Sequence, residues 1–183
     1  MDDRAHVSRR RFIVVSALST AAASLWSACT RFQPSTALTP EEVRIVEALA
    51  DQIVPPDGAP GGKDAGVAEF IDRQLRGPYR RHREAYRTGL ARIDETSRRV
   101  EREPFAALPF DRQTALLEAI EADRVPGGIW EPNEASRFFR LVTDHCLQGF
   151  YGSPRHGGNR NYASWKMLGL DNPQIVGRVV TKL

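Results

Sequence analysis

Apolar residues recur every three or four positions along the chain after residue 38, which is the spacing of one face of an α-helix. This spacing predicts helices within the segments 38–55, 64–77, 78–103, 104–121 and 134–150. No long stretch alternates apolar and polar residues, as a half-buried strand would. The pattern therefore predicts a mainly α fold, a single domain of about five helices joined by Gly/Pro-rich loops.

The starts of two of these helices carry capping signals. Thr39 is expected to cap the first helix, with Pro40 at its first position and Glu42 closing a capping box. The last long helix is expected to begin at Asn133 or Glu134. These residues supply the hydrogen-bond partners that the first turn of a helix lacks.

The connection between the first two helices, residues 55–66, reads PPDGAPGGKDAG and is long for a link between helices. Such a loop is expected to be functional or mobile. It lacks the Gly-x-x-x-x-Gly-Lys-Ser/Thr spacing of a P-loop, which argues against phosphate binding. Asp64, near its end, is the candidate cap of the second helix.

Two features of the helical part have competing interpretations. His145 and Cys146 share the apolar pattern of the last long helix, and we expect both to be core residues rather than ligands. The segment 78–103 is dense in arginine, and its acidic residues other than Glu84 come late. It is either a solvated helix face or a basic ridge that meets an acidic partner or a lipid surface.

The first 29 residues resemble a twin-arginine export signal. Arg9, Arg10 and Phe12 fit its pattern of two arginines, a spacer, then Phe and an aliphatic residue. The apolar stretch that begins at Phe12 has 15 residues, fewer than the about 20 that span a membrane. Cys29 follows Ser-Ala as in a lipobox, with Trp where Leu is usual. Lipidation of Cys29, ordinary cleavage and an uncleaved anchor all remain open.

The expected organisation is a signal segment 1–29, a tether 30–38 and a helical domain 39–183. The signal segment holds four arginines against two aspartates, so the net charge of +3 falls to +1 without it. A chain with so little excess charge offers no compositional argument for nucleic-acid binding. The signal predicts a periplasmic protein exported by the twin-arginine route and associated with the membrane.

The sequence holds little recognisable chemistry of its own. Two cysteines, Cys29 and Cys146, exclude a disulfide framework and a four-cysteine iron–sulfur cluster. No Cys-x-x-Cys, His-Glu-x-x-His, Gly-x-Gly-x-x-Gly or Gly-x-Ser-x-Gly motif occurs, so neither a metal nor a cofactor site is predicted. The twin-arginine route carries folded proteins that hold a cofactor or accompany a partner that does. The cofactor is therefore expected in another polypeptide.

The most distinctive stretch is Gly149–Lys166, which reads GFYGSPRHGGNRNYASWK. With the first helix, the glycine loop and the segment 104–121, it resembles the small subunit (subunit 3, or gamma subunit) of membrane-bound gluconate 2-dehydrogenase. The resemblance covers about residues 38–170. Family members carry a similar Gly-Phe-Tyr-Gly, a proline, an aromatic residue or histidine before Gly-Gly-Asn, and a Trp-Lys a few positions later. The twin-arginine signal is also typical of the family.

The resemblance implies a small subunit that is not an enzyme by itself. Its partner would be a large FAD-dependent dehydrogenase subunit of the glucose–methanol–choline class, acting on a sugar or sugar acid. The small subunit would escort that flavoprotein through the Tat translocase on its own signal. A cytochrome c subunit would carry the electrons onward in some complexes. The substrate does not transfer with the resemblance, because relatives accompany many oxidoreductases.

Within this stretch, glycine and proline favour close approach and rigidity, while aromatic residues and arginine favour contact with a partner. The opposite interpretation, equally open, is that the aromatic side chains pack on the chain's own core. The candidate partner-binding residues are Gly149, Phe150, Tyr151, Gly152, Arg155, His156, Gly157, Gly158, Asn159, Arg160 and Trp165.

Two other functions remain open at this stage. One is a lipid-tethered periplasmic binding protein without an enzyme partner. The other is a stand-alone enzyme that uses Tyr151, Arg155, His156 and Asn159 as a polar active loop, although no nucleophile–base pair is apparent.

Overall fold

A computed structural model of the protein describes residues 36–170. The described residues form the helices α2 (Pro40–Ile53), α3 (Val67–Arg76), α4 (Arg83–Val100), α5 (Phe110–Glu121), α6 (Glu134–Tyr151) and α7 (Ala163–Met167). Short 3-10 turns lie at Arg80–His82, Phe105–Ala107, Pro154–His156 and Arg160–Tyr162. No strand occurs in this part of the chain, and the prediction of a mainly α fold is confirmed. The helix beyond the five that the sequence predicted is the short α7.

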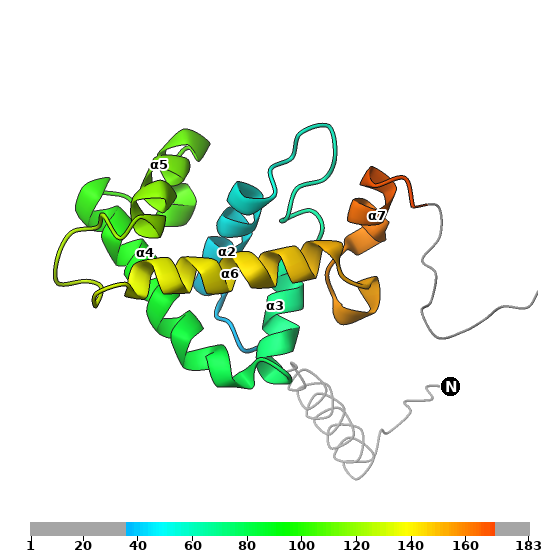
Figure 1. Ribbon diagram of the computed structural model, residues 1–183, viewed down its shortest axis with the longest axis horizontal. Helices are drawn as coiled ribbons and strands as arrows, with labels where there is room; N and C mark the ends of the chain where they lie inside the picture. Colours follow the sequence, from blue (N-terminus) through cyan, green and yellow to red (C-terminus); the bar gives the residue numbers. More distant parts are fainter. Residues whose placement is uncertain (1–35, 171–183) are drawn as a thin grey trace, which may run out of the picture. The chain divides into compact units, whose positions relative to one another are not determined.

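Helix α6 is the centre of the helical body. It contacts α2, α3, α4, α5 and α7. In Figure 1 it crosses the view horizontally, with α5 above one end and α7 at the other. Its buried face carries Phe138, Val142, Cys146 and Phe150, spaced four residues apart. A helix with partners along its whole length positions both of its ends, and the candidate site lies at its C-terminal end.

The core is formed by apolar residues from every long helix. Among them are Tyr86, Leu90 and Ile93 on α4 and Leu116, Leu117 and Ile120 on α5. At 20–33 cal/mol for each Å² of apolar surface removed from water, burial of this kind is the main term that stabilises the fold. Helix α4 approaches α6 closely at Gly89, where a Cβ atom would collide with the ring of Phe138.

The predicted capping box of the first helix is confirmed. The Thr39 hydroxyl accepts a hydrogen bond from the Glu42 amide (3.2 Å), and the Glu42 carboxylate accepts one from the Thr39 amide (2.7 Å). Pro40 occupies the first position of α2, where its missing N–H costs nothing. Three neighbouring residues therefore fix the beginning of α2.

Two predicted helix starts were wrong. Asp64 does not cap the second helix; α3 begins at Val67 after Gly66, which has φ of 76° in the left-handed region. Glycine adopts this conformation without the steric cost that other residues have, and this favours the sharp turn over a side-chain cap. The third helix begins at Arg83 rather than Pro78, because a 3-10 turn intervenes.

The end of the expected tether belongs to the folded body. Leu38 is buried, and the amides of Ala37 and Leu38 donate to one carboxylate oxygen of Asp72 on α3, at 2.7 and 3.0 Å. Asp72 in turn pairs with Arg76 at 3.2 Å. The chain therefore joins the helical body beside the C-terminal end of α3.

The second half of the glycine loop is held against α2. The Lys63 amide donates to the Asp51 carboxylate (2.8 Å), and the Gly62 amide donates to the Val54 carbonyl (2.9 Å). A Cβ atom on Gly62 would lie under 3.0 Å from the carbonyl group of Ala50. The loop thus presents the backbone of residues 61–66 to the C-terminal part of the chain.

Candidate partner interface

The distinctive stretch 149–166 wraps around the C-terminal end of α6. Its first residues complete α6, two 3-10 turns follow, and α7 contains its last four residues. Asn159, fully buried, holds this arrangement together. Its side-chain N–H donates to the Gly152 carbonyl, and its side-chain oxygen accepts from the Ser164 amide, both at 2.9 Å. One amide group therefore ties the end of α6 to the beginning of α7.

Glycines allow the backbone segments of this stretch to touch. A Cβ atom on Gly158 would lie under 3.0 Å from the carbonyl oxygen of Gly149, a separation that real Cβ atoms essentially never show. A Cβ atom on Gly149 would lie 2.8 Å from the ring of Phe70 on α3. The glycines thus allow close approach of backbone segments within this chain.

Further contacts fix the stretch to α3 and to the glycine loop. The Arg160 amide donates to the Ala65 carbonyl at 2.9 Å, and the Arg160 guanidinium pairs with Glu69 at 2.8 Å. Arg73 on α3 donates to the Arg155 carbonyl at 3.1 Å. Segments far apart in the sequence thus form one connected surface around the end of α6.

The candidate residues divide into an inner and an outer side. The inner side consists of four buried residues: Gly149, Phe150, Gly158 and Asn159. The outer side consists of four exposed residues: Tyr151, Arg155, His156 and Arg160. Gly152, Gly157 and Trp165 are half-buried, and the Trp165 indole N–H donates to the Tyr151 carbonyl (3.2 Å). Packing on the chain's own core and exposure toward a partner therefore both occur, for different side chains.

A groove of about 700 Å³ lies beside the outer side. Its lining is mainly apolar: Phe70, Pro78, Tyr79, Leu147 and Tyr151, with Gln74, Gln148, Gly152 and His156 among them. Leu147 and Tyr151 are 38% and 43% exposed. Beyond the groove, Tyr162, Met167, Leu168 and Leu170 are exposed as well. Neighbouring exposed apolar residues of this kind are typical of a protein interaction surface.

The polar groups of the outer side do not form a catalytic arrangement. His156 is exposed, and its Nε2 accepts a hydrogen bond from the Arg155 side chain at 3.0 Å. Asn159, which the active-loop hypothesis needs at the surface, is fully buried and occupied by two backbone partners. Among residues 36–170, no group of three or more His, Cys, Asp or Glu side chains is placed to hold a metal ion.

A buried aromatic and histidine cluster lies farther along α6. His145 Nδ1 and the Tyr86 hydroxyl share a hydrogen bond at 2.9 Å, and the ring of Tyr79 stacks on His145 at 4.1 Å between centroids. Burial, reinforced by the neighbouring charge of His82, lowers the pKa of His145 to about 4. Burial also raises the pKa of Cys146 to about 12. Both groups are therefore neutral at pH 7, and the prediction that they are core residues is confirmed.

The sequence analysis did not predict that Tyr79 and His82 belong to this cluster. Their spacing from Tyr86, seven and four residues, was the available signal, since positions four and seven apart share one helix face. The 3-10 turn before α4 keeps the three side chains on the side that faces α6, where His82 lies 5.4 Å from His145.

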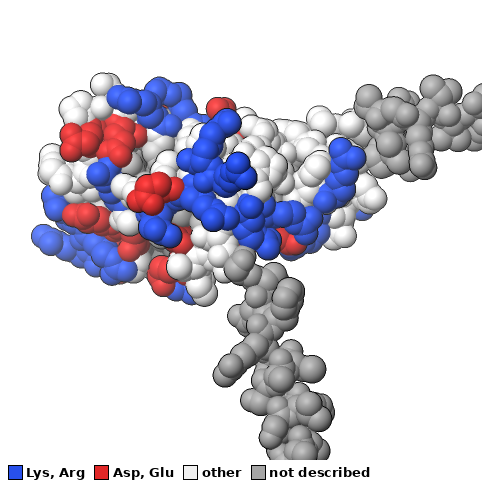
Figure 2. Space-filling model, turned by 90° about the horizontal axis from the view of Figure 1, so that it is seen from below, with Lys and Arg blue, Asp and Glu red and all other residues white. Residues whose placement is uncertain are grey.

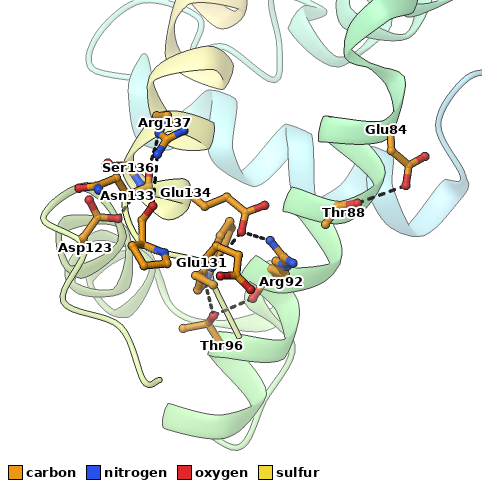
Figure 3. A network of polar contacts seen from close by, with 12 residues as sticks. Glu84, Thr88, Arg92, Thr96, Asp123, Glu131, Asn133, Glu134, Ser136 and Arg137 are labelled. Carbon is orange, nitrogen blue, oxygen red and sulfur yellow. Dashed lines mark hydrogen bonds and ion pairs between the residues drawn. The ribbon is translucent and has the colours of Figure 1, made fainter. Parts of the chain in front are cut away.

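The N-terminal end of α6 is held by a different kind of network, drawn in Figure 3. Arg92 on α4 forms an ion pair with Glu134 and lies 5.8 Å from the ring centroid of Trp130. The Trp130 indole N–H donates to the Thr96 hydroxyl (2.9 Å), which donates to the Arg92 carbonyl (2.7 Å). Asp123 accepts from the Ser136 amide at 3.1 Å, and the hydroxyl of Ser136, together with this amide, lowers the pKa of Asp123. The network is structural and joins α4, the loop that follows α5, and α6.

The predicted export and lipidation residues, Arg9, Arg10, Phe12 and Cys29, lie outside the described residues. Within 36–170, no helix has both the length and the apolar character needed to cross a membrane. The model of one protein family, described as gluconate 2-dehydrogenase subunit 3, matches residues 40–171 of the chain. The searches of curated proteins and of solved structures found no match.

Proposed function

Because the chain belongs to the gluconate 2-dehydrogenase subunit 3 family, we propose that it is the non-catalytic small subunit of a membrane-associated FAD-dependent dehydrogenase. The partner is a flavoprotein of the glucose–methanol–choline type that oxidises a sugar or sugar acid. The small subunit carries the twin-arginine signal, with Arg9, Arg10 and Phe12, and escorts the folded flavoprotein across the membrane. The complex works in the periplasm, in some cases with a cytochrome c subunit.

The observation that carries this proposal is the division of the stretch 149–166 into two sides. The inner side is buried in the chain's own fold and makes the backbone rigid. The outer side leaves Tyr151 exposed beside an apolar groove, with Arg155 and His156 around it. Aromatic and arginine side chains are common in interface hot spots. A rigid backbone favours binding because little conformational entropy is lost when the partner binds.

The character of the groove supports the assignment of the FAD cofactor to the partner. An FAD pyrophosphate is usually held by a glycine-rich turn at a helix N-terminus, with backbone N–H groups aimed at the phosphates. The groove instead lies beside the C-terminal part of α6 and has aromatic and aliphatic walls. The carbonyl groups at a helix C-terminus carry partial negative charge and disfavour an anion. The groove therefore suits an apolar segment of another protein.

The interface is tested by co-expressing the chain with a candidate flavoprotein and purifying the small subunit through a tag. We expect a stoichiometric FAD-containing subunit with wild-type protein, and its loss with the double variant Leu147→Gln/Tyr151→Gln. The control is Phe110→Gln, which removes an apolar side chain that is somewhat more exposed (50%), at the start of α5. Equal retention by all three proteins would contradict the assigned surface. Absence of any flavoprotein with wild-type protein would instead favour a lipid-tethered binding protein.

The escort role has its own test. Replacing Arg9 and Arg10 by lysine is expected to leave both subunits in the cytoplasm, because the flavoprotein is exported only as part of the complex. Cell fractionation with the FAD absorbance of each fraction measures this. A flavoprotein that still reaches the periplasm would show that it does not depend on this chain for export.

A further inference from the structure

The turn between α3 and α4 is the most basic part of the described chain. Residues 73–83 hold five arginines and no acidic residue. The five, Arg73, Arg76, Arg80, Arg81 and Arg83, are all exposed. Figure 2, which views the molecule from below relative to Figure 1, shows lysine and arginine side chains gathered across the middle of this face. We call residues 76–83, from the last residue of α3 to the first residue of α4, the basic turn.

Part of this charge has no opposing carboxylate. Arg76 pairs with Asp72 (3.2 Å), and farther along α4 Arg87 pairs with Glu84 (3.7 Å). Within residues 36–170, Arg80 and Arg81 have no carboxylate within 4.0 Å, and the Arg81 side chain instead donates to the neighbouring His82 ring (3.0 Å). Two adjacent exposed guanidinium groups therefore carry positive charge that no carboxylate among the described residues offsets, although the mature chain as a whole is almost neutral.

The chain joins the helical body at this same face. The amides of Ala37 and Leu38 are fixed to Asp72, the residue that also pairs with Arg76. Cys29 precedes Ala37 by only eight residues, and a fully extended stretch of that length spans at most about 29 Å. An apolar segment or a lipid at residues 12–29 is therefore connected by a short link to the side of the body that carries the basic turn.

We propose that the basic turn binds the headgroups of an anionic phospholipid bilayer and orients the subunit on the membrane. A single acyl chain gives only marginal membrane binding, and stable attachment takes a second signal such as a polybasic patch. Basic residues close to an anionic surface contribute about 1 kcal/mol each. Arg80 and Arg81 supply that second signal on the face where the tether ends. This holds for a lipidated Cys29 and for an uncleaved anchor alike.

The position of the tether favours a bilayer over an acidic protein partner. An acidic protein partner could bind the basic turn whether or not the tether joined the body near it. The short link from Cys29 to Ala37, by contrast, keeps the point where the chain enters this face within about 29 Å of any membrane that holds Cys29. The inference does not depend on the flavoprotein, because the apolar groove, not Arg80 or Arg81, carries that proposal.

The first test measures binding of the full chain to phosphatidylcholine vesicles with and without phosphatidylglycerol, by cosedimentation. We expect wild-type protein to bind the anionic vesicles more tightly, and Arg80→Gln/Arg81→Gln to lose about 25-fold, which is about fivefold for each 1 kcal/mol. The matched control is Arg98→Gln/Arg102→Gln at the other end of α4, with the same change in net charge. It should stay within about twofold, because charges far beyond the Debye length of about 8 Å are screened.

Several results would overturn the inference. Wild-type binding that is indifferent to phosphatidylglycerol, an unchanged Arg80/Arg81 variant, or equal losses in the two double variants would each do so. If the Arg80/Arg81 variant binds vesicles normally but no longer co-purifies with the flavoprotein, the face is a protein interface instead. Vesicle binding that depends on these arginines would support the inference even if no flavoprotein co-purifies with the chain and the proposed function fails.

A second measurement reads orientation even where the N-terminal segment dominates the affinity. A cysteine at Gly77 or at Gly127 carries a donor dye, in a Cys29→Ser background that leaves the uncleaved apolar stretch from Phe12 as the anchor. Neither position has an atom within 4 Å of an added Cβ, and Cys146 is buried. Energy transfer to a headgroup-labelled lipid is expected to be strong from position 77 and weak from position 127. Equal transfer, or the reverse order, would contradict the proposed orientation.

Discussion

The two ends of α6 are fastened by opposite means. At the N-terminal end, Arg92 and Glu134 form an ion pair whose side chains are 25% and 36% exposed, beside the Trp130 ring. At the C-terminal end, Asn159 is fully buried and Gly158 touches the backbone of Gly149. One end is held by long side chains that water can reach, the other by backbone contact and one enclosed amide.

The difference lies in how much each end can relax. Exposed ion pairs contribute about 0–1 kcal/mol, and the half-buried pair of Arg92 and Glu134 is expected to contribute little more, because water and other rotamers can replace it when one partner is lost. A backbone contact has no free rotamer, and a buried polar group that loses its partner costs about 1–3 kcal/mol. The end that carries the candidate interface is thus also the end that tolerates the least change.

The largest effect is expected for Gly158→Ala. The new methyl group would lie under 3.0 Å from the Gly149 carbonyl oxygen, so the end of α6 and the following loop must separate. We expect a loss of about 3 kcal/mol in the free energy of unfolding, and a melting temperature lower by about 6–12 °C. Gly127→Ala, where nothing lies within 4 Å, is the control. Similar melting temperatures for the two variants would remove the basis of the comparison.

Between the two ends, His145 makes stability depend on pH. Its folded pKa of about 4 lies below the unfolded value of about 6.5, so the unfolded chain binds the proton more tightly. The stabilisation is complete above pH 6.5 and is lost as the pH falls from 6.5 toward 4, by up to about 3 kcal/mol. Urea unfolding of wild-type protein and His145→Gln at several pH values measures it. A difference between the two that does not change with pH would contradict the assignment.

Asn159→Asp isolates the enclosed amide without changing its shape. The carboxylate can still accept from the Ser164 amide but cannot donate to the Gly152 carbonyl, which then faces a negative oxygen. We expect a loss of about 2 kcal/mol at pH 7. Part of it should return at low pH, because a protonated carboxyl group regains a donor. A cost that stays constant between pH 7 and pH 4 would mean that the hydrogen bond to Gly152 matters little.

Sequence reasoning succeeded where the cause is local. The capping box of Thr39 and Glu42 depends on residues three apart, and the buried positions of α4 and α5 follow from helical spacing. The prediction that Asp64 caps the second helix was wrong because a polar residue is only one way to begin a helix. The left-handed conformation of Gly66 is favoured by a contact distant in sequence. The Arg160 amide donates a hydrogen bond to the carbonyl of Ala65, which precedes Gly66.

The division of the candidate site could not be read from the sequence for the same reason. Tyr151 follows Phe150 directly, yet one ring is exposed and the other is fully buried, because only Phe150 is on the face of α6 that meets the core. Gly158 and Asn159 show their roles only once Gly149 and Gly152 are placed beside them. The sequence therefore identified a distinctive stretch, and the tertiary contacts decide which of its side chains are buried and which are exposed.

The smallest effect is expected for Glu134→Gln at the other end of α6. The amide removes the charge that pairs with Arg92 but keeps an oxygen for the Glu131 amide, which now donates to the carboxylate at 3.0 Å. Arg92 can turn its head group toward water while its stem stays against Trp130. The free energy of unfolding should fall by less than about 1 kcal/mol, and the salt dependence of stability should weaken. A cost as large as that of Gly158→Ala would mean that both ends of α6 are equally rigid, and rigidity could then no longer single out the C-terminal end as the docking surface.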